Sequence, residues 1–289
     1  MLTFKQFISE SAYTPSAISV EQFIEWCETH APQYLARMSK NPIFRGFNAP
    51  TLGLIDTNEM NRRSANTANY YTVWMDNDKA WSDFPKRSKS LICSTSLEQA
   101  SGFGYAQMII PADINKIGVC SNSDLWDSFN YLKMHIGARY LDMNKFMRLT
   151  SLFLRQVYDS QILVKAQDNY TVLVDCLKSI TLEFIRGAGK SCTAVDYTDY
   201  TDNIQHIIDT FESNNYKTLY DLWFDTMQPG ENGFRLVDGA KMSSAYNVEV
   251  WVQGECATLN VDYMFDAINK NLHPLHSFCL KYNLHKMDT

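Results

Sequence analysis

The chain has 289 residues, 45% of them hydrophobic and 20% charged, so it is long enough to bury a core of its own. Its formal net charge of −6 gives no basic surface for neutralising phosphates, which disfavours nucleic acid as a partner but leaves a nucleic-acid acceptor open. No stretch approaches the roughly 20 apolar residues of a membrane-spanning helix, so we expect no membrane partner.

The chain opens with a short amphipathic peptide, Met1 to Glu10, which we interpret as detachable. Ser19 with Gln22 three residues later is a capping-box pattern, and it predicts that a helix begins at the next position after Ser19. The apolar residues of this helix share one face until Pro32 interrupts the pattern. We therefore assign 11–41 to a linker and an N-terminal helix.

Short strands are predicted in the segment that follows, where apolar and β-branched residues alternate with polar stretches. The expected strands run over 43–47, 90–95, 105–110 and 116–121. Ser96 with Gln99 repeats the capping-box pattern, so the strand that ends at Thr95 should run into a short helix. A strand end, a turn and a helix start therefore meet at Ser94 to Ser96.

Apolar residues take a helical spacing over 123–228, with breaks expected near Gly187 and Asn214. The segment Gly187 to Ser191 resembles the end of a phosphate-binding P-loop. Phe184, however, stands where that pattern needs its first glycine, and no strand precedes the segment. We therefore expect an ordinary glycine-rich loop there.

A strand signal returns at 248–252, and a helix is predicted over 259–271. Strands on both sides of the helical stretch would form one core, made of 42–122 and 229–289 and interrupted by an insertion at 123–228. The predicted fold is α+β, with a split, mostly antiparallel β core.

The cysteines and histidines give no sign of a metal site. Seven cysteines are widely spaced, without a CxxC pair or a Cys/His cluster at the intervals of zinc ligands, so we expect free thiols in a reducing compartment. His273 and His276 have a spacing that could suit a metal ion, but no convergent carboxylate accompanies them. We expect surface or packing roles for these two histidines and no bound metal.

Three residues that could carry chemistry lie on separate predicted strands: Arg45, Ser94 and Glu249. An arginine between apolar strand residues needs an anionic partner if it is buried, and a phosphate is a suitable one. Taken singly, each residue also has a structural interpretation. Arg45 could pair with a core carboxylate, Ser94 to Ser96 could only cap a helix, and Glu249 could lie on a solvated strand face.

Together these residues resemble the arginine, serine, glutamate signature of the mono-ADP-ribosyltransferases, phage-encoded members included. The three blocks occur in the order of the family: Ile43-Phe44-Arg45-Gly46-Phe47, Ile92-Cys93-Ser94-Thr95-Ser96 and Val248-Glu249-Val250-Trp251-Val252. The middle block is the most specific, because 84–96 with the downstream Ala100 and Phe103 resembles the serine strand and following helix of the family. The resemblance covers 42–121 and 239–261, and the helical stretch between them is an insertion relative to the family.

The resemblance implies an enzyme that binds NAD and transfers its ADP-ribose. It implies that Arg45 holds NAD through its phosphates or the nicotinamide-side ribose, that Ser94 orients the catalytic carboxylate, and that Glu249 is that carboxylate. A fixed anion beside the ribose would stabilise the oxocarbenium-like charge that develops as the bond to nicotinamide breaks. Among the aromatic side chains that could support nicotinamide, Phe47, Phe103 and Tyr105, we rank Phe103 first. The residues expected to bind NAD are Arg45, Gly46, Ser94, Thr95, Ser96 and Phe103.

One departure from the family leaves the acceptor open. Asn247 stands where arginine-modifying members carry a second glutamate. In another register, Gln253 and Glu255 would mimic the glutamine-containing version of the motif, but Glu249 followed by Val-Trp-Val and Gly254 fits the strand of the family better. Two alternatives to transfer onto a host macromolecule follow: an NAD glycohydrolase that uses water, and an inactive transferase fold that serves as an internal head protein or host-factor binder.

Met1 to Glu10 resembles the capsid-targeting peptides of internal head proteins in large contractile-tailed phages. Ile8-Ser9-Glu10 matches the cleavage pattern of such peptides: an aliphatic residue, any residue, then glutamate. With the transferase signature, this implies a protein packaged in the virion head and then injected into the host cytoplasm. Its partners would be NAD and a host protein that the helical insertion helps to select, with no metal or second cofactor.

Overall fold

A computed structural model of the chain describes residues 14–36, 42–50, 52–64, 67–135, 141–191, 198–237 and 247–284. Helices and an antiparallel sheet both contribute to it, which confirms the predicted α+β class. The described residues divide into two compact units. We call them the sheet unit, within Met1–Ala65, Phe84–Asp124 and Arg235–Thr289, and the helical unit, within Asn66–Asp83 and Leu125–Phe234. The peptide Met1 to Glu10 lies outside the described residues.

The sheet unit is built on one nine-stranded sheet with the order β1-β3-β9-β5-β2-β4-β8-β6-β7, and the pairings between these described strands are antiparallel. The strands are β1 Ser16–Ala17, β2 Phe44–Phe47, β3 Leu52–Asp56, β4 Ser90–Ser94, β5 Tyr105–Pro111, β6 Ile117–Val119, β7 Arg235–Leu236, β8 Glu249–Gln253 and β9 Glu255–Asn260. The core is therefore split in the sequence but continuous in space, because β8 and β9 insert between strands from the first half of the chain.

The sequence pattern located β2, β4, β5, β6 and β8 correctly and missed β1, β3, β7 and β9. The predicted helix over 259–271 was wrong at its start, since β9 runs to Asn260 and α13 begins only at Val261. Residues Cys256 to Asn260 are all buried. A strand buried on both faces lacks the alternation of apolar and polar residues that marks a half-exposed strand.

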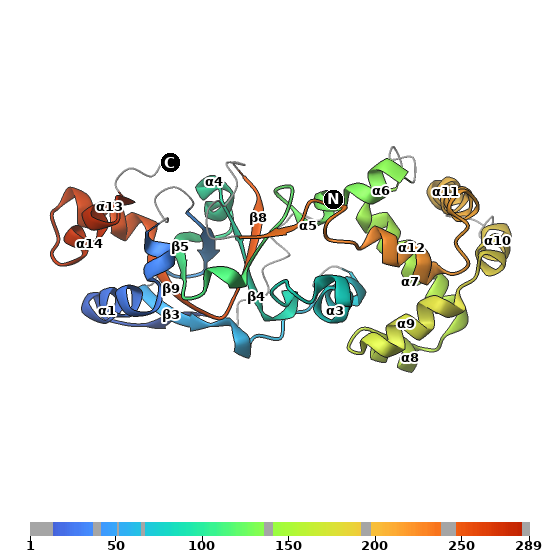
Figure 1. Ribbon diagram of the computed structural model, residues 1–289, viewed down its shortest axis with the longest axis horizontal. Helices are drawn as coiled ribbons and strands as arrows, with labels where there is room; N and C mark the ends of the chain where they lie inside the picture. Colours follow the sequence, from blue (N-terminus) through green and yellow to red (C-terminus); the bar gives the residue numbers. More distant parts are fainter. Residues whose placement is uncertain are drawn as a thin grey trace. The chain divides into compact units, whose positions relative to one another are not determined.

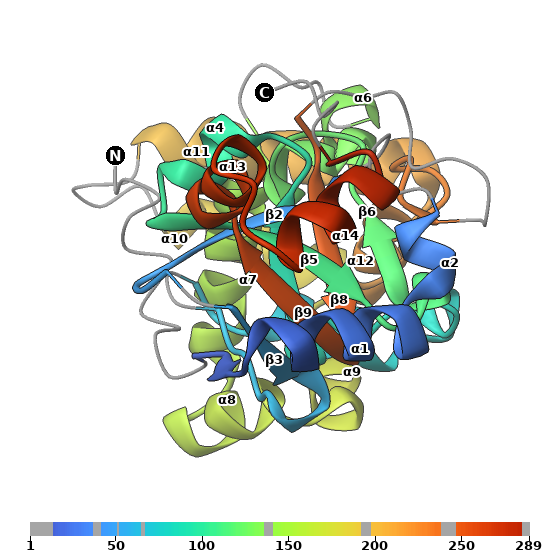
Figure 2. The ribbon, with the colours of Figure 1, turned by 90° about the vertical axis from the view of Figure 1, so that its left-hand side faces the viewer.

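Helices α1 (Val20–His30), α13 (Val261–Asn269) and α14 (Leu275–Lys281) pack against the sheet over β3, β5 and β9 (Figure 2). The predicted capping box is present: the Ser19 hydroxyl accepts from the Gln22 N–H at 3.2 Å, and the Gln22 side chain accepts from the Ser19 N–H at 3.0 Å. Helix α1 ends at His30, and the short helix α2 (Pro32–Leu35) starts at the proline. The N-terminal helix and the C-terminal helices thus close one core with the strands.

Helix α4 (Leu97–Ser101) lies close against β2, β4 and β5. A Cβ atom at Gly46 would stand 2.4 Å from the Ala100 carbonyl oxygen and 2.7 Å from the Phe103 carbonyl carbon. Both neighbours are backbone atoms that cannot turn away, so only glycine allows this approach. The strand, turn and helix expected around Ser94 to Ser96 are confirmed.

The helical unit contains α3 Tyr70–Asn77, α5 Leu125–Ser128, α6 Asn130–His135, α7 Met143–Val157, α8 Ser160–Ala166, α9 Tyr170–Ser179, α10 Leu182–Ser191, α11 Thr198–Asn214 and α12 Leu219–Thr226 (Figure 1). Its core is rich in large aromatic rings. Trp74, for example, meets Tyr170 and Trp223 at centroid distances of 5.6 and 5.5 Å. Ring packing and hydrogen bonds at both ends of α3 join it to the later helices: Asn69 donates to Gln167, and the Tyr170 hydroxyl donates to Asp78.

Two features of the helical unit differ from the sequence interpretation. Helix α3 belongs to this unit, although 42–122 was assigned to the strand core. Residues Tyr70 to Met75 are all buried and mostly aromatic or β-branched, so they show no single apolar face. Gly187 to Ser191 was predicted as a loop, but it forms the end of α10. Burial of Ile185 and Ala188 in that helix outweighs the cost of about 1 kcal/mol for a helical glycine.

Candidate functional site

Ser94 and Glu249 lie directly opposite each other on the adjacent strands β4 and β8. The register pairs Ser94 with Glu249, Ile92 with Trp251 and Ser90 with Gln253. Opposite residues of an antiparallel pair put their side chains on the same face, with Cβ atoms about 4.5 to 5.5 Å apart. Both residues are buried, at 6% and 5% exposure. A hydroxyl and a carboxylate that are far apart in the sequence are thus neighbours inside the sheet unit.

The hydroxyls of Ser94, Thr95 and Ser96 each make a hydrogen bond within the fold. The Ser94 hydroxyl donates to Gln99 Oε1 at 2.5 Å and accepts from the Ser96 N–H at 2.9 Å. Ser96 caps α4 by accepting from the Gln99 N–H at 3.2 Å. Thr95 Oγ1 accepts from the Val248 N–H at 2.9 Å, so Thr95 fastens β4 to the start of β8 and holds Glu249 opposite Ser94.

Gln99 has a role that its place in the capping pattern did not reveal. Its Oε1 meets the Ser94 hydroxyl, and its Nε2 donates to the Ser123 carbonyl at 3.2 Å. Because the Gln99 amide is held at both ends, it fixes the direction of the Ser94 hydroxyl. The sequence predicted Gln99 as a helix-start residue, and only the fold brings its side chain to Ser94.

Glu249 is ion-paired with Arg87, a residue that the sequence interpretation gave no role. Arg87 Nη2 lies 2.7 Å from Glu249 Oε1, and the two side chains are 2% and 6% exposed. The Arg87 guanidinium also lies over the Trp251 ring, 5.6 Å from its centroid. A buried carboxylate requires such a partner, since desolvating an unpaired charge is costly. Glu249 is therefore not on a solvated strand face.

Arg87 stands in the basic run Lys86-Arg87-Ser88-Lys89, which has the composition of an exposed loop. The run forms a short 3-10 turn, Arg87–Lys89, before β4. Only the Arg87 side chain of this run is buried in the core. No periodicity in four residues could have distinguished it from its neighbours.

Arg45 lies on β2, the strand on the other side of β4. The register of β2 and β4 pairs Phe44, not Arg45, with Ser94, so Arg45 starts from the opposite face of the pleat. Its Nη1 donates to the Ile92 carbonyl of β4, and its guanidinium lies 5.6 Å from the Phe47 ring centroid. The side chain therefore bridges β2 and β4 close to Ser94.

The remaining residues expected to bind NAD, Gly46 and Phe103, lie at the end of α4. Gly46 is covered by the backbone at Ala100 and Phe103, so its place is set by packing. Phe103 is partly buried there, whereas Phe47 is buried beside Arg45 and Tyr105 is 50% exposed. Among the three aromatic candidates, Phe103 is the one that adjoins both Gly46 and α4.

The alternative pair Gln253 and Glu255 lies away from Ser94. Gln253 is at the far end of β8, opposite Ser90, where it accepts from the Lys86 N–H at 2.7 Å and donates to Asn58 at 3.1 Å. Glu255 begins β9, opposite Asp56, and is exposed. Of the two glutamates considered, only Glu249 adjoins Ser94.

A buried thiol adjoins this cluster on β4. Burial raises the pKa of Cys93 to about 12, and Arg45 and Glu249 act on it in opposite directions. At neutral pH the Cys93 thiol is protonated and a poor nucleophile. Covalent chemistry at this site would have to use other groups.

The described part of the chain holds no group of three or more His, Cys, Asp or Glu side chains arranged to bind a metal ion. The rings of His273 and His276 are 6.1 Å apart, and His273 Nδ1 lies 3.1 Å from the Ser277 hydroxyl. Among the described helices, none is long and apolar enough to cross a membrane.

The cluster as a whole is a rigid anion set beside a fixed hydroxyl. Such an arrangement can stabilise positive charge on a substrate or accept a hydrogen bond from its hydroxyl groups. Compared with known proteins, the chain matches no family model, no curated protein and no solved structure.

Proposed function

We propose that this protein is a mono-ADP-ribosyltransferase that uses NAD as substrate and modifies a host macromolecule. The observation that most supports the proposal is the pairing of Ser94 with Glu249 on adjacent strands, with Arg45 on the next strand. Ser94 and Glu249 share one face of the sheet, and Arg45 reaches β4 from the neighbouring strand β2, where it starts from the other face. The finer assignment to an ADP-ribosyltransferase-like core rests on the same argument.

In the proposed reaction the bond between ribose C1′ and nicotinamide breaks, and its electron pair leaves with nicotinamide. The acceptor then bonds to C1′ and gives up a proton. Glu249 would stabilise the oxocarbenium-like charge in the transition state, Ser94 would orient the site beside it, and Arg45 would bind the phosphates. Arg87 would keep the Glu249 carboxylate in one position, so that little reorganisation is needed at the moment of reaction.

We also propose the life history implied by the N-terminal peptide: packaging in a phage head, removal of Met1 to Glu10 and action in the host cytoplasm. Mass spectrometry of the protein from purified virions would test it. A mature N-terminus at Ser11 is expected, and an intact Met1 in the virion would contradict it.

Two observations favour alternative functions. Asn247, with its positive φ of 64°, occupies the position of the second glutamate, which favours water as acceptor and hence an NAD glycohydrolase. The burial of Glu249 against Arg87 favours an inactive binding protein, because a structural ion pair would have the same geometry.

The experiment incubates purified full-length protein with NAD labelled in its ADP-ribose part and a lysate of the host bacterium. Discrete labelled bands with wild type, lost in Glu249→Gln, support the transferase. Nicotinamide release without labelled bands supports the glycohydrolase. Absence of both from folded wild-type protein rejects both enzymes and leaves the binding function.

Control variants are needed to show that the protein still folds, because Glu249→Gln removes the carboxylate that pairs with the buried Arg87 guanidinium. The double variant Arg87→Gln/Glu249→Gln removes both charges, and Ser94→Ala leaves the ion pair intact. Circular dichroism and thermal melting of each variant separate a loss of chemistry from a loss of fold.

A further inference from the structure

The Ser94 hydroxyl is a hydrogen-bond donor to one neighbour and an acceptor from another. It donates its proton to Gln99 Oε1 at 2.5 Å and accepts from the Ser96 N–H at 2.9 Å. A hydroxyl has one proton and two lone pairs, so these two bonds use the proton and one lone pair. The capacity that remains is one acceptor position. Ser94 can therefore receive a further hydrogen bond, but it has no second proton to give.

The direction of the bond between Ser94 and Gln99 is set at the other end of the Gln99 amide. Its Nε2 donates to the Ser123 backbone carbonyl at 3.2 Å. A carbonyl oxygen can only accept, so the NH₂ group of the amide must lie at Ser123 and its oxygen at Ser94. A flipped amide would put two acceptor oxygens against each other at Ser123. The Ser123 carbonyl thus determines that Ser94 donates to Gln99 and not the reverse.

Helix α4 holds Gln99 in this place through its backbone as well. Ser96 caps the helix by accepting from the Gln99 N–H at 3.2 Å, and Gly46 of β2 lies against the far end of the helix. The backbone and the side chain of Gln99 are therefore both fixed by hydrogen bonds within the sheet unit. The Ser94 hydroxyl does not have to turn before a donor approaches, so the site is preorganised.

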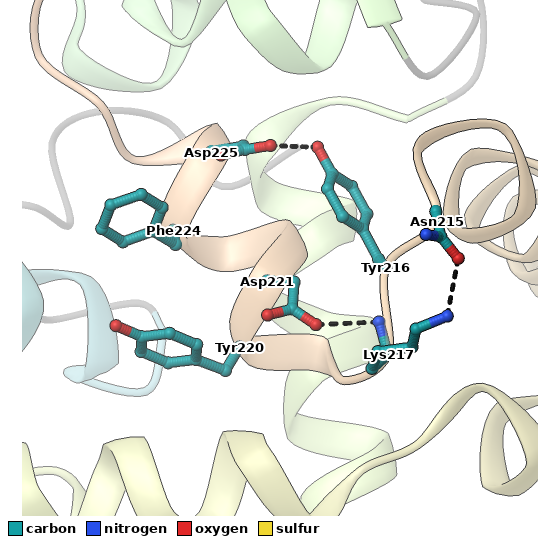
Figure 3. Close-up of a pocket in the computed structure, with 7 residues that line it drawn as sticks. All are labelled: Asn215, Tyr216, Lys217, Tyr220, Asp221, Phe224 and Asp225. Atoms are coloured by element: carbon teal, nitrogen blue, oxygen red, sulfur yellow. Dashed lines mark hydrogen bonds between the residues drawn. The ribbon is translucent and has the colours of Figure 1, made fainter.

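The polar groups around a surface cavity of the helical unit differ from Ser94 in this respect (Figure 3). The cavity lies at the turn between α11 and α12. Asp221 accepts there from the Lys217 N–H at 2.8 Å, and Asp225 accepts from the Tyr216 hydroxyl. These carboxylates hold the turn and the start of α12, so their hydrogen bonds serve the fold. Ser94 instead combines a fixed orientation with an acceptor position next to Glu249.

Ser94 and Glu249 present two hydrogen-bond acceptors on the same face of the sheet. They lie opposite each other on β4 and β8, where Cβ atoms are about 4.5 to 5.5 Å apart. A ribose carries two neighbouring hydroxyl groups, and each can donate one hydrogen bond. An anionic group such as the diphosphate of NAD has no proton to donate, and it would approach the Glu249 charge. A sugar hydroxyl is thus the part of NAD that suits this pair of acceptors.

We propose that Gln99 is a positioning residue that presents Ser94 as an acceptor for a hydroxyl of the nicotinamide-side ribose, beside Glu249. The inference rests on the proposed function, because it concerns NAD at the same site. Ser94 then contacts the substrate itself, whereas the resemblance implies that Ser94 orients the catalytic carboxylate. Gln99 stays one residue removed from the substrate and acts through the Ser94 hydroxyl.

The test measures kcat/KM for nicotinamide release from NAD by the full chain. Gln99→Lys keeps donors for the Ser123 carbonyl but offers Ser94 no acceptor, whereas Gln99→Glu keeps an acceptor and loses the donors. Glu98 is exposed on the same helix, and Glu98→Gln changes the net charge by the same amount and sign as Gln99→Lys, so it is the matched control. Thermal melting of each variant verifies its fold.

Gln99→Lys should lower kcat/KM by about tenfold, as expected for one lost hydrogen bond, and it should lose more than Gln99→Glu. Glu98→Gln should match wild type. With Ser94→Ala added, Gln99→Lys and Gln99→Glu should have equal rates, because Gln99 acts through the hydroxyl. An unchanged rate in Gln99→Lys, a larger loss in Gln99→Glu, or a difference that persists beside Ser94→Ala would overturn the proposal.

Two NAD analogues test the ribose contact, one without the 2′ hydroxyl and one without the 3′ hydroxyl of the nicotinamide-side ribose. With one of them, the loss of kcat/KM relative to NAD should be about tenfold larger in wild type than in Ser94→Ala. Equal losses in the two proteins for both analogues would overturn the hydroxyl contact. Absence of nicotinamide release by folded wild type rejects the proposed function and this inference with it, whereas the contrary results for the variants and analogues reject the inference alone.

Discussion

Each unit of the protein contains an arginine–glutamate ion pair, and the two pairs lie in opposite surroundings. Arg87 and Glu249 in the sheet unit are 2% and 6% exposed, whereas Arg186 and Glu212 in the helical unit are 47% and 51% exposed. The first pair is desolvated and held between strands and Trp251, and the second is solvated. The same two residue types thus form a buried ion pair that constrains the core of one unit and a solvent-screened ion pair on the surface of the other.

The largest expected effect is therefore on the buried pair. Arg87→Met removes the ion-pair partner of the buried Glu249 carboxylate, and we expect it to lower the free energy of unfolding by about 3 to 5 kcal/mol. The exposed counterpart Arg186→Met should cost no more than about 1 kcal/mol. Urea unfolding of the two variants measures both values, and similar small losses would show that the buried pair is not needed for the fold.

The two arginine variants can be sharpened with a double variant. Arg87→Met/Glu249→Gln removes both charges of the buried pair. Its loss of unfolding free energy should be smaller than the sum of the losses measured for Arg87→Met alone and Glu249→Gln alone. Simple additivity would mean that the two side chains do not interact as their 2.7 Å separation implies.

Glycines provide a second, smaller contrast between the units. A Cβ at Gly46 would stand 2.4 Å from a backbone oxygen, whereas nothing lies within 4 Å of one at Gly187 on α10. Gly46→Ala should destabilise by about 1 to 3 kcal/mol through overpacking. Gly187→Ala should instead stabilise by about 0.4 to 1 kcal/mol. Thermal melting gives the signs, and a neutral Gly46→Ala would contradict the close approach of α4 to β2.

Capping of α4 is expected to matter less. Ser96→Ala removes the bond to the Gln99 N–H and should cost about 1 kcal/mol. The same change at Ser19, which caps α1, is the matched control for stability. If Ser94 positioning depends on the start of α4, Ser96→Ala should also lower the rate of NAD turnover, while Ser19→Ala should not. Equal effects on turnover would remove that link.

The smallest expected effect depends on pH. Hydrogen bonding to Lys281 lowers the pKa of Glu28, an exposed side chain that links α1 to α14. A carboxyl group whose pKa is lowered by folding adds stability above its unfolded-state pKa, and this stability is lost as the pH falls through the folded value. Glu28→Gln should thus lose a little stability at neutral pH and converge with wild type in acid. A difference that grows in acid would refute the pairing.

The strands that carry Arg45, Ser94 and Glu249 could be predicted from the sequence because each is a short apolar run bounded by polar or turn-forming residues. The sequence pattern missed α3, whose residues are buried all round, and β9, in which Thr258 and Asn260 are buried beside apolar neighbours. In both elements, burial on every side erases the periodicity from which a helix or strand is predicted.

The residues around Glu249 were harder to foresee than Glu249 itself. Arg87 and Gln99 act through tertiary contacts, to a strand far along the chain and to the Ser94 hydroxyl. Their own neighbourhoods suggested a solvated basic run and a helix cap. A local pattern can locate a strand, but it cannot tell which side chain of a loop the fold will bury.

The most direct test of the central claim is the rate of nicotinamide release from NAD, measured for wild type, Glu249→Gln and Glu255→Gln. Both variants remove one carboxylate charge, but Glu249 is buried opposite Ser94 and Glu255 is exposed at the start of β9. We expect Glu249→Gln to lower the rate by about 10²-fold or more, while Glu255→Gln stays near wild type. Equal rates in folded Glu249→Gln and wild type, or no release by wild type, would contradict it.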